Sequence, residues 1–184
     1  MKIYETYGFG SEVKTELIHT DLSSNGINKP KSCWWGSPVG GDYTWKEWCI
    51  AECFKDEDYF DESNRSIWTL KEGSNIYTIE DLEDLYFLRN KGYYIQIVDG
   101  EKYPLPSGSD ISMLSRSFMF SRIEIDFEQM CKDGYAAIEL ENPVIGHMFI
   151  DQIELSMNSW DCQSIAVLDS TKIIPLKKEE KLYA

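Results

Sequence analysis

The stretch NKPKSCWWGSPVGGDYTWKEWC, Asn28–Cys49, holds four of the six tryptophans of this chain and two of its five cysteines. It also contains two turn sequences rich in glycine and proline, GSP and GG. Indole side chains provide large flat apolar surfaces, which proteins use both in cores and in binding sites. The segment is therefore either one dense corner of the core or the wall of a site.

Within this stretch we predict a strand followed by a helix. Ser32–Val39 is expected to be a short strand, and Pro38 marks an edge or an exit because proline cannot donate to a sheet ladder. Thr44–Phe54 has the spacing of an amphipathic helix, with Thr44 as N-cap and Glu47 completing a capping box. The helical spacing indicates that Trp48 and Cys49 belong to the core.

Strands dominate the rest of the chain, and the short helices are scattered among them. Predicted strands cover Lys2–Gly8, two segments within Ser66–Ile79, Gly92–Val98, Tyr135–Leu140, Ser164–Asp169 and Lys172–Leu176. Predicted helices cover Ile79–Asn90, with Leu82, Leu85 and Tyr86 inward, and the residues from Ile125 to a stop at Gly134. Asp99–Asp110 is expected to be a loop, and Ser11–Leu22 fits a helix or a strand. Because helices and strands do not alternate regularly, the pattern favours a single α+β domain that spans residues 1–184.

The chain is strongly acidic. Its 184 residues carry 18 Lys and Arg against 32 Asp and Glu, a net charge of −14. Such a protein is repelled by duplex nucleic acid and by anionic membranes, so a basic protein is the easier macromolecular partner. The acidic runs Lys55–Glu62 and Thr78–Leu85 are read as solvated faces, with capture of a basic partner or mimicry of nucleic acid as alternatives.

The cysteines and the apolar pattern point to a cytoplasmic protein without a metal site. The five cysteines include no paired CxxC units with nearby histidines, so we expect reduced thiols and no bound metal. The N-terminus lacks a signal-peptide core, and no apolar segment reaches the length of a membrane helix.

Familiar catalytic motifs are absent from the sequence, including the phosphate-binding P-loop, the HExxH zinc motif and the GxSxG serine motif. His147 has no acidic or cysteine neighbour at ligand spacing and is read as structural. His19 is read as a surface or satisfied histidine, although it could bond a ligand hydroxyl. Asp161 and Gln163 stand two apart before an apolar strand, where they either cap the strand edge or face a cleft.

The order of these motifs resembles a family of small bacterial and phage proteins with an ADP-ribosyltransferase-like fold. The resemblance runs from about Lys29 to Ile174, and its pieces are KP, CWWGSP, TWKEWC, IWTLKEGSNIYTI, IDFEQMCKDGYAAIEL and WDCQSIAVLD. The family usually has glycines where this chain has Ser32 and Cys33, and Trp34 is a further departure. These changes would narrow or occlude a pocket. The resemblance implies split antiparallel β-sheets with short flanking helices that clamp NAD⁺ as a substrate.

The resemblance also implies roles for particular residues. Asp161 would be the carboxylate that stabilises the positive ribose as nicotinamide leaves, because such a charge is stabilised most in the transition state. Gln163 stands where the family commonly has an acid, and it could orient a ribose hydroxyl. The superfamily's first-strand His or Arg is missing. The cofactor-binding residues implied are Tyr4, Thr6, Lys29, Trp35, Ser37 and Trp45.

Two functions are thus expected. The first is an NAD-dependent mono-ADP-ribosyltransferase that modifies a macromolecular acceptor, most simply a protein, in phage–host conflict. The second is a catalytically inactive binding or inhibitor protein on the same scaffold, such as a phage anti-defence protein. The missing His or Arg, Gln163 and the net charge of −14 favour the second.

Overall fold

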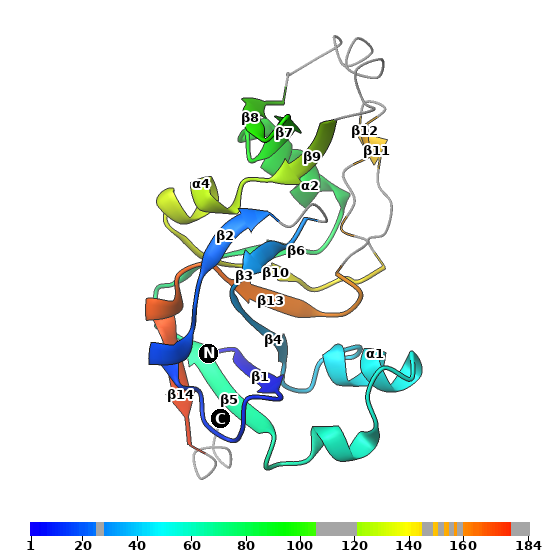
Figure 1. The fold of residues 1–184 in the computed structure, drawn as a ribbon, viewed down its shortest axis with the longest axis vertical. Helices are drawn as coiled ribbons and strands as arrows, with labels where there is room; N and C mark the ends of the chain where they lie inside the picture. Colours follow the sequence, from blue (N-terminus) through cyan, green and yellow to red (C-terminus); the bar gives the residue numbers. More distant parts are fainter. Residues whose placement is uncertain are drawn as a thin grey trace.

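The computed structural model shows a mixed α+β chain made mostly of β-sheet, with few helices (Figure 1). The structure describes residues 1–24, 28–105, 121–144, 149–150, 153–154, 157 and 160–177. Within these residues the helices are short: α1 spans Trp45–Ala51, α2 spans Leu82–Asn90 and α4 spans Phe127–Lys132. The 3-10 turns in the described part of the chain cover Thr15–Leu17, Glu57–Phe60 and Ser170–Lys172.

The largest sheet in the described part of the chain has seven strands in the order β14-β5-β1-β4-β13-β10-β6. Its strands are β1 Ile3–Tyr7, β4 Trp34–Pro38, β5 Arg65–Leu70, β6 Asn75–Ile79, β10 Tyr135–Leu140, β13 Ser164–Val167 and β14 Ile173–Leu176. All neighbours are antiparallel except β10 and β6, so the prediction of antiparallel sheets is wrong for that pair. Parallel neighbours need a long crossover, and residues 80–134 provide it.

The two strands at the centre of this sheet separate along their length. β1 pairs with β4 only at Tyr4–Pro38 and Glu5–Ser37. Beyond this point β1 follows β5 as far as the Tyr7–Arg65 pair. β4 instead follows β13 as far as the Trp34–Val167 pair. The sheet is therefore split where the end of β1 and the beginning of β4 part.

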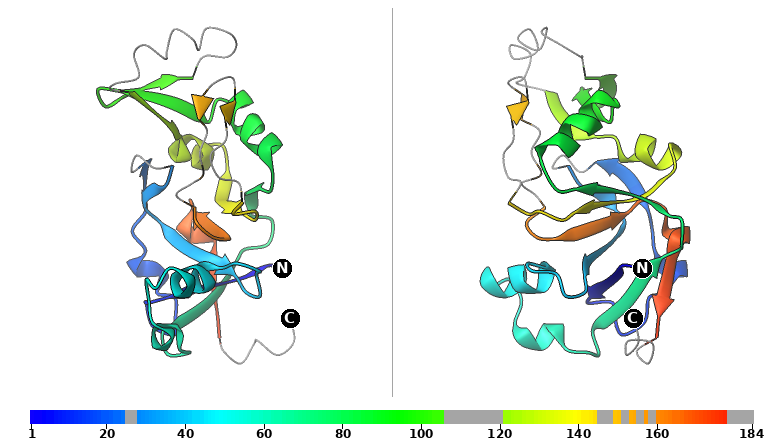
Figure 2. Two further views of the ribbon diagram at one scale, coloured as in Figure 1. Left: turned by 90° about the vertical axis from the view of Figure 1, so that its right-hand side faces the viewer. Right: turned by 180° about the vertical axis from the view of Figure 1, so that it is seen from behind.

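The described residues of the crossover, 80–105 and 121–134, form a second layer above one half of the sheet, as the two further views show (Figure 2). It contains a three-stranded sheet in the order β8-β7-β9, made of β8 Glu101–Pro104, β7 Tyr94–Val98 and β9 Ser121–Ile125. The main core lies between this layer and the sheet and includes Leu85, Phe127, Ile138 and Trp160. The remaining strand pairs are β2 Asp21–Ser24 with β3 Pro30–Ser32, and β11 Phe149–Ile150 with β12 Ile153–Glu154.

The predicted helix that follows the tryptophan pair is present and has the expected start. Thr44 and Glu47 form the capping box of α1, and the backbone N–H of Thr44 donates to Glu47 Oε2 at 3.0 Å. The helix ends at Ala51, three residues before the predicted end. Cys49 is fully buried, as expected, whereas Trp48 is only half-buried.

Three local expectations are corrected by the structure. Glu101–Pro104 is strand β8 rather than loop, because it pairs with β7; residues 106–110 of the predicted loop lie outside the described residues. On α2 the inward residue after Leu85 is Leu88, which is fully buried, whereas Tyr86 is 38% exposed. The ambiguous segment Ser11–Leu22 contains a 3-10 turn at Thr15–Leu17 and ends in the first two residues of β2. No helix in the described part of the chain is long and apolar enough to cross a membrane.

Candidate functional site

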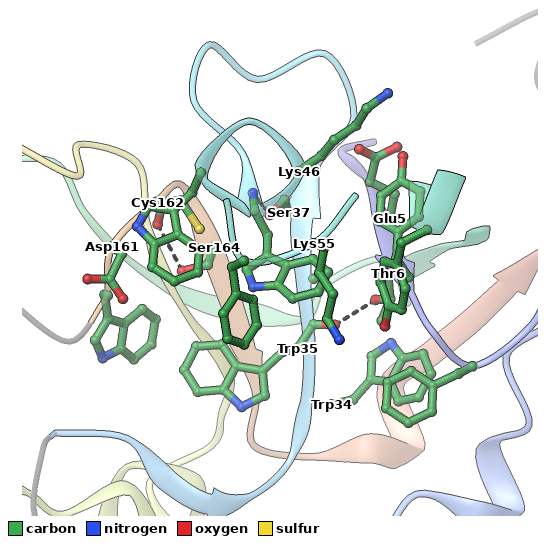
Figure 3. A pocket seen from close by; sticks show the side chains of 18 of the residues that line it. Glu5, Thr6, Trp34, Trp35, Ser37, Lys46, Lys55, Asp161, Cys162 and Ser164 are labelled. Atoms are coloured by element: carbon green, nitrogen blue, oxygen red, sulfur yellow. Dashed lines mark hydrogen bonds between the residues drawn. The ribbon is translucent and has the colours of Figure 1, made fainter. Parts of the chain in front are cut away.

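A cavity of about 570 Å³ lies at the split between β1 and β4 (Figure 3). The end of β1 forms one side, the beginning of β4 forms the floor, and the residues just before β13 form the opposite side. Helix α1 and the segment after it, from Phe54 to Tyr59, complete the wall. The volume falls in the range of small-molecule and cofactor sites.

Most of the residues expected to bind a ligand come together here. Six of the eight line the cavity: Thr6, Lys29, Trp35, Ser37, Trp45 and Asp161. The other two, Tyr4 and Gln163, are not part of the lining. The expected narrowing does not close the space, since Cys33 and Trp34 themselves belong to its wall.

Tyr4 is held inside the core instead. Only 1% of it is exposed, and its ring stacks on Trp68 with 4.9 Å between centroids. Its hydroxyl donates to Glu139 Oε2 at 3.4 Å, and burial, with Glu139 nearby, raises the pKa of Tyr4 far above its ordinary value. The structure therefore places Tyr4 outside the cavity.

Both polar atoms of the Gln163 side-chain amide form hydrogen bonds with backbone groups, which link its own segment to Tyr43 and Glu141. Its Nε2 donates to the carbonyl of Glu141 at 2.9 Å, and its Oε1 accepts from the N–H of Tyr43 at 3.3 Å. Its own N–H donates to the carbonyl of Tyr43 at 2.8 Å. Gln163 thus fixes the loop before α1 to the end of β10, a role that is structural in this arrangement.

The aromatic wall rests on contacts between β4 and more distant segments. Trp35 meets Trp160 edge to face, with 4.7 Å between ring centroids. Trp160 is 1% exposed and is fixed because its indole N–H donates to the carbonyl of Asn28 at 2.7 Å. The sequence did not identify Trp160, although it directly precedes Asp161. Ser37 accepts a 3.0 Å hydrogen bond from the backbone N–H of Trp45, which ties α1 to the cavity floor.

Carboxylates stand on opposite sides of the cavity in Figure 3. Asp161 is exposed and lies on the β13 side. Glu5, on β1, is 8% exposed and was missed because an acidic residue within a strand gives no signal by itself. Arg65 holds Glu5 in place with its Nη2 2.6 Å and its Nε 2.7 Å from Glu5 Oε2. Glu5 is thus already paired with a cation, whereas Asp161 forms no ion pair among the described residues and can stabilise positive charge that develops beside it.

The thiols of the cavity are poor nucleophiles. Cys33 and Cys162 both belong to the lining, and burial raises the pKa of each to about 12. A thiol with so high a pKa stays protonated at neutral pH, and the thiolate is the reactive form. Covalent catalysis by these cysteines is therefore disfavoured.

A second hollow of about 250 Å³ shares a wall with the first. Phe9, Cys33 and Trp34 belong to both, and His19 lines only the smaller one. His19 is exposed and lies outside the main cavity. Within the described residues, no group of three or more His, Cys, Asp or Glu side chains is arranged to hold a metal ion.

The chain matches no protein-family model and no curated protein, and its structure matches no solved structure.

Proposed function

We propose that the chain is an NAD-dependent mono-ADP-ribosyltransferase with an ADP-ribosyltransferase-like fold, and that it modifies a protein acceptor. The observation that supports this most is the cavity at the split of β1 and β4. It collects Thr6, Lys29, Trp35, Ser37, Trp45 and Asp161, which come from five separate segments of the chain. A basic acceptor suits the net charge of −14.

The proposed reaction breaks the bond between the ribose C1′ and the nicotinamide nitrogen. The electron pair of that bond goes to nicotinamide, which leaves neutral, and positive charge moves to the ribose. A nucleophilic atom of the acceptor then bonds to C1′ and gives its proton to solvent. Asp161 stabilises the positive ribose more in the transition state than in bound NAD⁺, and Trp35 provides a flat wall for the nicotinamide ring.

The test is release of nicotinamide and transfer of labelled ADP-ribose to proteins of a cell lysate. Asp161→Asn removes the charge with little change in shape, and we expect it to lower the rate by about 100-fold or more. Asp42→Asn, which removes an exposed charge outside the cavity lining, is the matched control. Absence of nicotinamide release by the wild-type chain, or an Asp161→Asn rate within twofold of wild type, would remove the enzymatic proposal.

The second candidate is a non-catalytic binding or inhibitor protein on the same scaffold, such as a phage anti-defence protein. The engaged amide of Gln163 favours it, as does a first strand that has Tyr4 and Thr6 where the resemblance implies His or Arg. If this candidate is right, we expect the chain to form a stoichiometric complex with a basic protein. The complex should form without NAD⁺ and weaken as the salt concentration rises. Calorimetry with NAD⁺, followed by the nicotinamide assay, separates the two.

A further inference from the structure

Among the described residues, three lysines line the cavity: Lys29, Lys46 and Lys55. Within the described part of the chain, none of the three forms an ion pair with a carboxylate. Three other cations, Lys2, Arg65 and Lys102, each bind two carboxylates. The cavity also holds Glu5 and Asp161, but Glu5 is paired with Arg65, so three lysines gathered around one cavity without an ion pair leave positive charge there for an anionic ligand.

Lys55 is the one basic residue of the acidic run Lys55–Glu62, and its ammonium packs on aromatic rings rather than on a carboxylate of that run. Its Nζ lies 4.7 Å from the ring centroid of Tyr59 and 5.4 Å from that of Phe54. In Figure 3 the side chain of Lys55 extends into the cavity toward Trp35 and Thr6. Contacts between a cation and aromatic rings fix the ammonium without neutralising it, so its charge remains available to a ligand.

Lys29 approaches from another wall. Its Nζ lies 5.5 Å from the ring centroid of Trp35, and burial lowers its pKa although the charge of Asp161 opposes this. A half-buried ammonium without a hydrogen-bonded counter-ion is costly, and an incoming anion would remove that cost. Lys46, by contrast, points away from Trp35 in Figure 3 and stands at the rim.

We propose that Lys29 and Lys55 together bind the diphosphate of a nucleotide whose flat ring packs on the tryptophan wall. The choice of NAD⁺ as that nucleotide rests on the proposed function, but the phosphate contact does not, because ADP-ribose carries the same diphosphate. Two ammonium groups from different walls suit two linked phosphates, and each charge-assisted contact strengthens binding where water is partly excluded.

Calorimetric titration with ADP-ribose, NAD⁺ and nicotinamide tests the proposal. We expect Lys55→Glu to weaken the binding of ADP-ribose about tenfold to 100-fold, to reduce its salt dependence and to leave the binding of nicotinamide within twofold. Lys91→Glu is the matched control, because Lys91 also lies over an aromatic ring, with Nζ 5.3 Å from the centroid of Phe87, and it is not part of the cavity lining. It makes the same change of charge and should bind ADP-ribose within twofold of wild type.

The outcomes separate this inference from the proposed function. If the wild-type chain binds ADP-ribose through Lys55 but neither binds NAD⁺ nor releases nicotinamide, the phosphate site stands and the transferase proposal falls. If NAD⁺ and ADP-ribose bind equally well to the wild type and to Lys55→Glu, the phosphate site is overturned while the transferase proposal survives. Equal losses in Lys55→Glu and Lys91→Glu would show a general effect of charge and would also overturn it. So would a wild-type chain that does not bind ADP-ribose.

Discussion

The hydroxyl of Thr6 donates a 2.6 Å hydrogen bond to the backbone carbonyl of Trp35, across the point where β1 and β4 separate. The same oxygen accepts a 3.0 Å hydrogen bond from the indole N–H of Trp68. One hydroxyl therefore links both sides of the split to the core. In this way the side chain replaces a ladder hydrogen bond that the diverging backbones no longer make.

We predict that Thr6→Val, which keeps the shape of the side chain, lowers the free energy of unfolding by about 1–3 kcal/mol. The substitution leaves both the indole N–H of Trp68 and the carbonyl of Trp35 without this partner in a buried place. Thr6→Ser, which retains the hydroxyl, should lose less. Urea denaturation measures both, and equal stability of Thr6→Val and the wild type would contradict the prediction.

A second prediction concerns Gly36 of β4, whose backbone packs against Trp68. A Cβ at this position would lie 2.5 Å from Trp68 Cζ2 and 3.0 Å from the backbone oxygen of Glu5. Gly36→Ala should therefore destabilise the fold by about 1–3 kcal/mol through overpacking. Trp68→Phe removes the nearer of these atoms, so the double variant should be more stable than the sum of the two single effects allows. Strict additivity in thermal or urea unfolding would refute this.

Gln163 is expected to be structural rather than catalytic. Gln163→Glu can still accept from the N–H of Tyr43, but it can no longer donate to the carbonyl of Glu141 and faces that oxygen with a negative charge. We expect a loss of about 1–3 kcal/mol in the free energy of unfolding and no gain in nicotinamide release. Faster release by Gln163→Glu at unchanged stability would mean that this position belongs to the chemistry.

The buried carboxyl of Glu139 should make stability depend on pH. It is 2% exposed, lies 2.8 Å from Lys2 Nζ and accepts from the hydroxyl of Tyr4; burial raises the pKa of Glu139 although Lys2 opposes the shift. When the pKa of an acid is higher in the folded state than in the unfolded state, its protonated form stabilises the fold. This stabilisation is fully present below the unfolded pKa, about 4.3, and is lost as the pH rises through the raised folded pKa.

In Glu139→Gln the side chain is neutral at every pH, so this variant does not lose stability through ionisation at position 139. The free energy of unfolding of the wild type, minus that of Glu139→Gln, should therefore fall as the pH rises from about 4 toward neutrality. Urea denaturation at a series of pH values measures the difference, in which titrations common to both proteins cancel. A difference that is constant or grows with pH would contradict the direction of the pKa shift.

The five thiols should differ in their rate of alkylation. Cys53 is exposed, whereas Cys49 and Cys162 are buried and burial raises their pKa values to about 11 and about 12. Iodoacetamide at neutral pH should modify Cys53 first, and peptide mass spectrometry identifies the site. Rapid modification of Cys162 in the folded protein would indicate an activated thiol in the cavity and would support covalent catalysis by a cysteine.

Local features were readable from the sequence because they depend on neighbouring residues. The capping box of Thr44 and Glu47 starts α1 as predicted, and the strand ending at Pro38 is present as β4. Partners far along the chain were not readable in this way. Tyr4 had a suitable position for a ligand contact, yet its place depends on Trp68, 64 residues away, on which its ring stacks. β8 was missed because its partner β7 decides its conformation.

By itself, the sequence determined the mixed α+β composition, the acidic charge and the aromatic segment from which much of the cavity wall is built. Periodicity, capping and turn chemistry carry that information because they act within a few residues. Only the tertiary structure decided that β1 leaves β4 after Glu5, where β1 continues along β5 and β4 continues along β13. That divergence opens the space into which Lys55 extends, and pairing over such distances is set by the fold as a whole.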